Sequence, residues 1–249
     1  MAVGESGTIL TSSDNGASWD NRTSGSVNRL QGVTFGNNNF VAVGRSGTIL
    51  TSSDNGTSWD IPGFTDATTN NLYGVTYGSF SLSVNNKFVV VDINGKIRTS
   101  NRWGGSWTEN ISSLSNDGLE AVTFANSLFV AVGWTGHIQT SSNGGQWYRG
   151  ASGTTYRLRG VTYGNNTFVV TGYGGIILTS SNPPVYASGA YWDSRNSGTT
   201  ESLAGAIYGN GIFVAVGDSG TILTSSDVIT WTPRSSGTSV GLTGVTYKE

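Results

Sequence analysis

The chain has 249 residues, 11% of them charged, and a formal net charge of −2, a length that allows one large all-β domain or two small ones. So few charged residues argue against nonspecific electrostatic binding to nucleic acid or to an anionic membrane. Cysteine is absent and His137 is the single histidine, which excludes disulfides, thiolate metal sites and multi-histidine zinc sites.

The composition also bears on location. No apolar run approaches the roughly 20 residues that span a bilayer, so we expect no membrane insertion. The opening Met-Ala-Val-Gly-Glu lacks the basic and apolar regions of a signal peptide. The polar, low-charge, cysteine-free composition favours an extracellular or periplasmic bacterial protein, which we expect to be a monomer without a cofactor.

A repeat of about 40 residues dominates the chain. Each copy starts with a strand (A) that resembles Leu-x-Gly-Val-Thr-Phe, continues with Phe-Val-Ala-Val-Gly (B) and Thr-Ile-Leu-Thr-Ser-Ser (C), and reaches a Trp that opens a fourth strand (D). The A strands are predicted to begin at Leu30, Leu72, Leu119, Leu158, Leu203 and Leu242. Four short strands per repeat predict the blades of a β-propeller.

We therefore predict an all-β, six-bladed propeller of four-stranded antiparallel blades. In chain order the predicted blades span residues 242–249 with 1–29, then 30–71, 72–118, 119–157, 158–202 and 203–241. The first blade would close the ring, because residues 1–4 match strand B and residues 242–247 match strand A. Pairing these two strands would remove the free sheet edges.

The turn between strands C and D carries a second motif. It reads Ser-Ser-Asp-Asn-Gly-Ala-Ser-Trp over 12–19 and Ser-Ser-Asp-Asn-Gly-Thr-Ser-Trp over 52–59. These turns resemble the Asp-box of BNR and sialidase-type propellers, and the flanking Val-Gly-x-Ser-Gly-Thr-Ile-Leu pattern looks most like photosystem II assembly factors. We interpret Asp14, Asp54 and Asp227 as turn-forming residues, not metal ligands.

Strand direction places the B–C and D–A loops on one face, where three positions differ from copy to copy beside fixed neighbours. Large aromatic and charged side chains are frequent there, as in a concave ligand site. The candidate ligand-binding residues are Glu5, Arg29, Gln31, Arg45, Tyr73, Glu120, Trp134, Arg157, Arg159, Tyr173 and Asp218.

Three functions fit these residues. The first is a non-catalytic module that binds a carbohydrate or another polar ligand, with aromatic rings stacked on sugars. The second, implied by the resemblance to the assembly factors, is a scaffold that docks a protein through an Arg-bearing face formed by Arg29, Arg45, Arg157 and Arg159. The third is a glycoside hydrolase with a carboxylate pair chosen from Glu5, Asp218 and Glu120. We expect His137 to be an ordinary surface or hydrogen-bonding residue.

Overall fold

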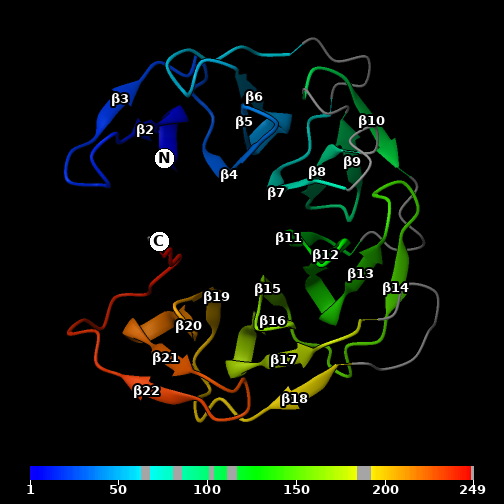
Figure 1. The fold of residues 1–249 in the computed structure, drawn as a ribbon, viewed down its shortest axis with the longest axis vertical. Coiled ribbons are helices and arrows are strands. Elements are labelled where there is room, and N and C mark those ends of the chain that lie inside the picture. Colours follow the sequence, from blue (N-terminus) through cyan, green and yellow to red (C-terminus); the bar gives the residue numbers. More distant parts are fainter. Residues whose placement is uncertain (63–67, 81–85, 101–103, 111–116, 184–191, 248–249) are drawn as a thin grey trace. The chain divides into compact units, whose positions relative to one another are not determined.

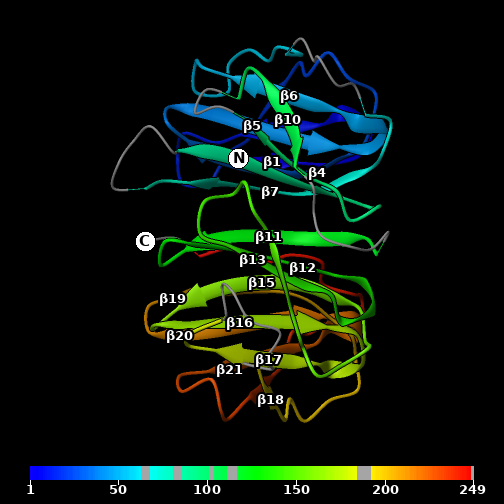
Figure 2. The ribbon, with the colours of Figure 1, turned by 90° about the vertical axis from the view of Figure 1, so that its right-hand side faces the viewer.

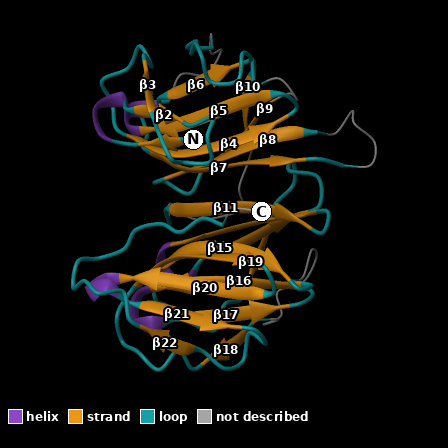
Figure 3. Ribbon diagram, turned by 60° about the vertical axis from the view of Figure 1, so that its left-hand side comes forward, coloured by secondary structure: helices purple, strands orange, loops and turns teal. Residues whose placement is uncertain are grey.

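The computed structural model describes residues 1–62, 68–80, 86–100, 104–110, 117–183 and 192–247. They form six antiparallel sheets connected by turns and short 3-10 helices (Figures 1 and 3). The contacts divide the chain into two compact units, residues 1–129 with 141–147 and residues 130–140 with 148–249. None of the described helices has the length and apolarity that crossing a membrane requires.

Three sheets lie in the first unit. Their strands are β1 (Ala2–Val3), β2 (Ile9–Thr11) and β3 (Asp20–Arg22); β4 (Leu30–Gly36), β5 (Asn39–Gly44) and β6 (Ile49–Ser52); and β7 (Leu72–Gly78), β8 (Lys87–Asp92), β9 (Ile97–Ser100) and β10 (Trp107–Asn110). The division between the units runs through the next sheet, which consists of β11 (Leu119–Ala125), β12 (Leu128–Gly133), β13 (Ile138–Ser141) and β14 (Tyr148–Gly150).

The second unit holds the last two sheets. Their strands are β15 (Leu158–Gly164), β16 (Thr167–Gly172), β17 (Ile177–Ser180) and β18 (Asp193–Arg195); and β19 (Leu203–Gly209), β20 (Ile212–Gly217), β21 (Ile222–Ser225) and β22 (Thr232–Arg234). Short 3-10 turns follow five B strands: η1 (Glu5–Gly7), η2 (Arg45–Gly47), η4 (Trp134–Gly136), η5 (Tyr173–Gly175) and η6 (Asp218–Gly220).

The predicted strands A, B and C are confirmed in repeats two to six, and four of the six sheets have all four predicted strands. In the second repeat, strand D is reduced to a single bridge between Thr51 and Asp60. Pro62 follows there and has no N–H to donate to a ladder. In the first sheet β1 pairs only with β2, and the described residues 242–247 form no strand, so ring closure stays a prediction.

Four of the A strands contain the same irregularity at their start. The pairing of β4 with β5 jumps from Leu30–Gly44 to Gly32–Val43, which leaves Gln31 as an extra residue. The same shift occurs in β7, β15 and β19. Because a bulge re-aims the extra side chain, it gives the variable position after the Leu its own orientation.

Neighbouring A strands pack closely within a unit. In the first unit β4, β7 and β11 lie side by side (Figure 2). A Cβ atom on Gly32 would stand 3.1 Å from the carbonyl oxygen of Tyr73, and one on Gly74 would stand 3.1 Å from that of Glu120. At these two positions the backbone of the next sheet leaves little room for a side chain, which favours glycine.

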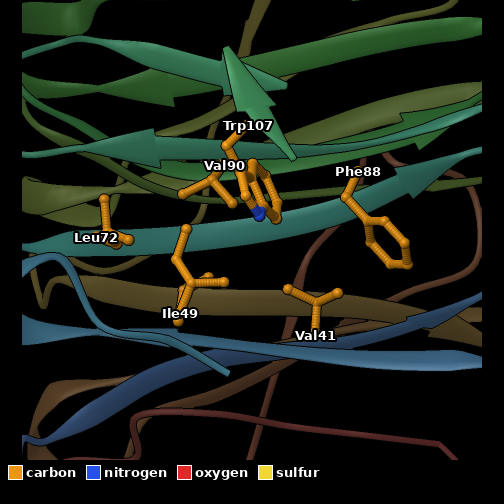
Figure 4. Close-up of a cluster of buried hydrophobic side chains, with 7 residues drawn as sticks. Val41, Ile49, Leu72, Phe88, Val90 and Trp107 are labelled. Atoms are coloured by element: carbon orange, nitrogen blue, oxygen red, sulfur yellow. The ribbon is translucent and has the colours of Figure 1, made fainter. Parts of the chain in front are cut away.

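The hydrophobic cores lie between consecutive sheets. Figure 4 shows one of them, in which Val41 and Ile49 of one sheet meet Leu72, Phe88 and Trp107 of the next. An equivalent cluster in the second unit joins Val169 and Ile177 to a set on the last sheet that consists of Leu203, Phe213, Ala215, Leu223 and Trp231. Alternate residues of strands B and C thus face opposite neighbours, as the period of a strand requires.

The Asp-box turns are held together by their own hydrogen bonds. Asp54 accepts hydrogen bonds from Ser58, through its hydroxyl at 2.6 Å and its N–H at 2.9 Å, and from the Ser52 hydroxyl at 2.8 Å. These donors favour the ionised carboxylate and lower the pKa of Asp54 to about 2, with the Ser58 hydroxyl as the largest cause. Ser18 lowers the pKa of Asp14 to about 2 in the same way, which supports the interpretation of the motif as a turn.

One buried charge network replaces apolar residues in the third sheet. Asp92 is fully buried and stands where the second repeat has Gly44, and Arg98 stands where it has Leu50. The Arg98 guanidinium lies 2.7 Å from Asp92 and 2.9 Å from Glu109. Asp92 also accepts hydrogen bonds from Asn70, Asn94 and Lys96, each at 2.9 Å, so every carboxylate oxygen has two donors.

Candidate binding site

The variable residue of four B–C turns is fixed through its backbone. In the fifth repeat the Tyr173 N–H donates to the Arg157 carbonyl at 2.9 Å, and the same bond joins Arg45 to Arg29 and Asp218 to Ser202. The side chain takes no part in this bond. The turn itself needs two residues with positive φ, for example Thr135 (52°) and Gly136 (70°). Within each unit, a B–C turn therefore lies against the residue that precedes a strand A.

In the first unit, an ion pair joins a B–C turn to the residue that precedes a strand A. The Arg29 guanidinium lies 2.9 Å from the Glu5 carboxylate, and both side chains are largely exposed. Arg45 is exposed on the next turn. Gln31, Tyr73 and Glu120 are half-buried, each one residue after the first Leu of its A strand.

In the second unit the equivalent positions form a stack of rings and cations. Arg157 stands at the repeat position of Arg29, and its guanidinium carbon lies 5.2 Å from the centre of the Trp134 ring and 5.3 Å from that of Tyr173. Arg159 lies 5.6 Å from the Tyr173 ring. We call Trp134, Arg157, Arg159 and Tyr173 the Arg–aromatic cluster. Its contacts are cation–π interactions, which hold two positive charges at a partly exposed surface.

The last sheet continues this surface with the opposite charge. Asp218 is exposed at the repeat position of Glu5, but Gly241 stands where Arg29 would pair with it. A Cβ atom on Gly241 would lie 3.4 Å from the Asp218 carboxylate. Glu201, nearby, accepts a hydrogen bond from the Ser219 hydroxyl at 3.0 Å. The second unit therefore carries a basic group and an acidic group on successive turns.

The structure brings together only some of the predicted residues. Glu5 contacts Arg29, and Trp134, Arg157, Arg159 and Tyr173 form one cluster. Glu5 and Glu120 belong to the first unit and Asp218 to the second, so a carboxylate pair for glycoside hydrolysis stays a prediction. Of these three carboxylates, Glu5 forms an ion pair with Arg29.

One residue beside the cluster escaped the sequence comparison. Tyr156 is 56% exposed, and its ring lies 3.2 Å from the Cβ position of Gly174 in the next turn. The same position holds Asn28, which donates to Thr48 at 2.9 Å, and Asn70, which donates to Asp92 at 2.9 Å. The residue at this position of the D–A loop differs between repeats, and this variation is the signal in the sequence that could have identified Tyr156.

The described residues offer no metal centre. No group of three or more His, Asp or Glu side chains among them could hold an ion. His137 is fully buried, and its ring nitrogen lies 3.1 Å from the Gln139 amide, so it is a hydrogen-bonding residue and not a surface one.

Comparisons with known proteins bear on the fold. No protein-family model matches the chain, and no curated protein sequence matches it. A solved structure described as "YCF48 bound to D1 peptide" is similar with a TM-score of 0.62 at 16% identity, over 82% of this chain and 66% of that one. Another, "YCF48 from Cyanidioschyzon merolae", has a TM-score of 0.46 at 16% identity over 86% of this chain and 87% of that one.

The first of these likenesses shows the fold, a β-propeller built from repeats. This chain spans 66% of the length of that structure. None of the comparisons shows the Asp-box family, which stays a resemblance of two turns.

Proposed function

We propose that this chain is a non-catalytic, protein-binding propeller that docks an acidic stretch of a polypeptide on the Arg–aromatic cluster. The observation that carries the proposal is the Arg157 guanidinium between the Trp134 and Tyr173 rings, at 5.2 and 5.3 Å. Stacking restricts the guanidinium, and its Nη1 also donates to the Tyr173 hydroxyl at 3.4 Å, so the group is held in place at the surface. A carboxylate of a partner can then bind it at a low cost in side-chain entropy.

Two further points support a polypeptide over a sugar. A protein with a similar fold is recorded as bound to a peptide. In addition, guanidinium groups already cover a face of Trp134 and of Tyr173, and those faces are then closed to a sugar ring. Carbohydrate binding, the first function expected from the residues, has the weaker support.

The proposal is tested with a library of random short peptides, selected on the purified protein and then measured one by one. We expect the selected peptides to contain Asp or Glu, and Arg157→Gln to weaken their binding by about tenfold or more, since hydrogen bonds to charged groups are at stake. Arg29→Gln is the matched control, because Arg29 has the same repeat position but pairs with Glu5. Peptides without acidic residues, or equal losses in both variants, would refute the proposal.

The closed six-bladed ring is part of the proposal. It is supported by Leu242, whose N–H donates to the Gly217 carbonyl at 2.9 Å just as the Leu30 N–H donates to Gly4 at 2.9 Å. By the register of Val33 with Ala42, Val245 would pair with Ala2. Cysteines at positions 2 and 245 should therefore form a disulfide in the monomer, whereas their failure to oxidise, beside a 42/33 cysteine pair that does, would argue against closure.

A further inference from the structure

Asparagine is followed by glycine at five places in the chain, each of them in a turn that the structure describes. In such a pair the glycine has no side chain to keep its main-chain nitrogen away from the asparagine side chain. The two groups can then react with each other, so the pair is prone to deamidation. The five pairs begin at Asn15, Asn55, Asn94, Asn143 and Asn210.

Deamidation of such a pair begins within the chain itself. The main-chain nitrogen of the glycine loses its proton and attacks the side-chain carbonyl carbon of the asparagine. The bond from that carbon to the side-chain nitrogen breaks, and this nitrogen leaves with the proton as ammonia. One water molecule then opens the cyclic imide at either carbonyl, which yields aspartate or isoaspartate. A glycine N–H that is bonded in the folded chain opposes the first step.

Four of the pairs have such a bonded N–H. In three of them the glycine donates to the hydroxyl of the serine that ends strand C, at 2.7 Å for Gly16, 2.9 Å for Gly56 and 2.8 Å for Gly144. In another, Gly95 donates to the Asp92 carbonyl at 3.1 Å. Gly56, Gly95 and Gly144 are also buried. The folded chain therefore protects these pairs.

The fifth pair forms the tip of the hairpin between β19 and β20. Gly209 pairs with Ile212 across this tip, and Asn210 and Gly211 both have positive φ, 48° and 79°, as in a type I′ turn. Both tip residues are exposed, and none of the described residues accepts a hydrogen bond from the Gly211 N–H. A Cβ atom on Gly211 would meet nothing within 4 Å. This pair thus has a free N–H and room to react.

The other two-residue tips between strands A and B lack the glycine. Their second residues are Asn38, Ser127 and Asn166, which also have positive φ. A side chain at this position obstructs the approach of the main-chain nitrogen to the preceding asparagine. Among the described tips of this kind, the glycine distinguishes the one on the last sheet.

We propose that Asn210 is the preferred site of spontaneous deamidation in the folded chain. The product places a carboxylate at the hairpin tip, and its isoaspartate form also lengthens the backbone there. The inference is independent of the proposed function, because the A–B tips and the B–C turns lie at opposite ends of the strands in each sheet.

The test incubates the folded protein at mildly alkaline pH and follows each pair by mass spectrometry after digestion. Trypsin cleaves after Lys and Arg and places the five pairs in five different fragments. We expect Asn210 to deamidate at least about tenfold faster than each of the other four, because a bonded N–H must first lose its partner. In guanidinium chloride, which removes the turns, the five rates should become similar.

Two variants test the cause. Gly211→Asn installs the Asn-Asn tip of the second and fifth repeats and should slow the reaction of Asn210 by about tenfold or more while it keeps the hairpin. Ser12→Ala removes the acceptor of the Gly16 N–H and should speed the reaction of Asn15 several-fold.

Four results would overturn the proposal. They are a second pair that reacts as fast as Asn210 in the folded protein, a preference for Asn210 that persists in guanidinium chloride, an undiminished rate in Gly211→Asn, and an unchanged rate at Asn15 in Ser12→Ala.

Discussion

Replacing Asp92 by alanine is expected to lower the free energy of unfolding by about 3–5 kcal/mol. The substitution leaves the buried Arg98 guanidinium without its 2.7 Å partner and removes the acceptor that organises the turn through Asn94 and Lys96. Denaturant unfolding of both proteins measures the difference.

The control is the exposed pair of Asp20 and Arg22, at 3.0 Å, in which the Asp20 side chain is 73% exposed. Asp20→Ala should cost less than about 1 kcal/mol, because surface pairs contribute little. The double variant Asp92→Gly with Arg98→Leu installs the residues of the second repeat and should recover most of the loss, because apolar replacements of buried pairs are often neutral. If Asp92→Ala costs no more than Asp20→Ala, the network does not stabilise the sheet.

Replacing Trp107 by alanine should cost about 3–5 kcal/mol, the range for large aromatic residues removed from a core. Its ring fills the space between two sheets beside Val41, Ile49 and Phe88, and is 4% exposed (Figure 4). Thermal or denaturant unfolding gives the value.

Trp107→Phe separates packing from hydrogen bonding. It keeps an aromatic ring and loses only the 2.9 Å bond from Nε1 to the Gly104 carbonyl together with part of the ring, so we expect a cost nearer 1 kcal/mol. Equal costs for the two variants would mean that the hydrogen bond, and not the packing, accounts for the contribution of the motif.

The repeat made most of the fold predictable. The Leu of strand A and the Trp after strand C recur in all six repeats, and the glycine two residues after the Leu recurs in five of them, so the copies reinforce one another. Pro62 was a readable signal for the missing strand in the second sheet. No signal in the sequence indicated the bulge after Leu30, because register depends on pairing between strands.

The sequence predicted which residues of the candidate site share one end of the sheets, but not which of them are in contact. Strand direction placed Trp134, Arg157 and Tyr173 at one end of the sheets, but which side chains touch depends on rotamers and on both neighbours. Arg29 and Arg157 occupy the same repeat position, yet one pairs with Glu5 and the other stacks on rings.

In the B–C turns, the main chain and the variable side chain have separate roles. Since the N–H of residues such as Tyr173 and Asp218 carries the bond that secures the turn, the identity of the side chain is released from the demands of folding. Each turn can therefore carry different side chains at this position while its backbone conformation stays the same. New binding specificity could arise, in evolution or in the laboratory, by single substitutions at these positions without compensating substitutions in the core.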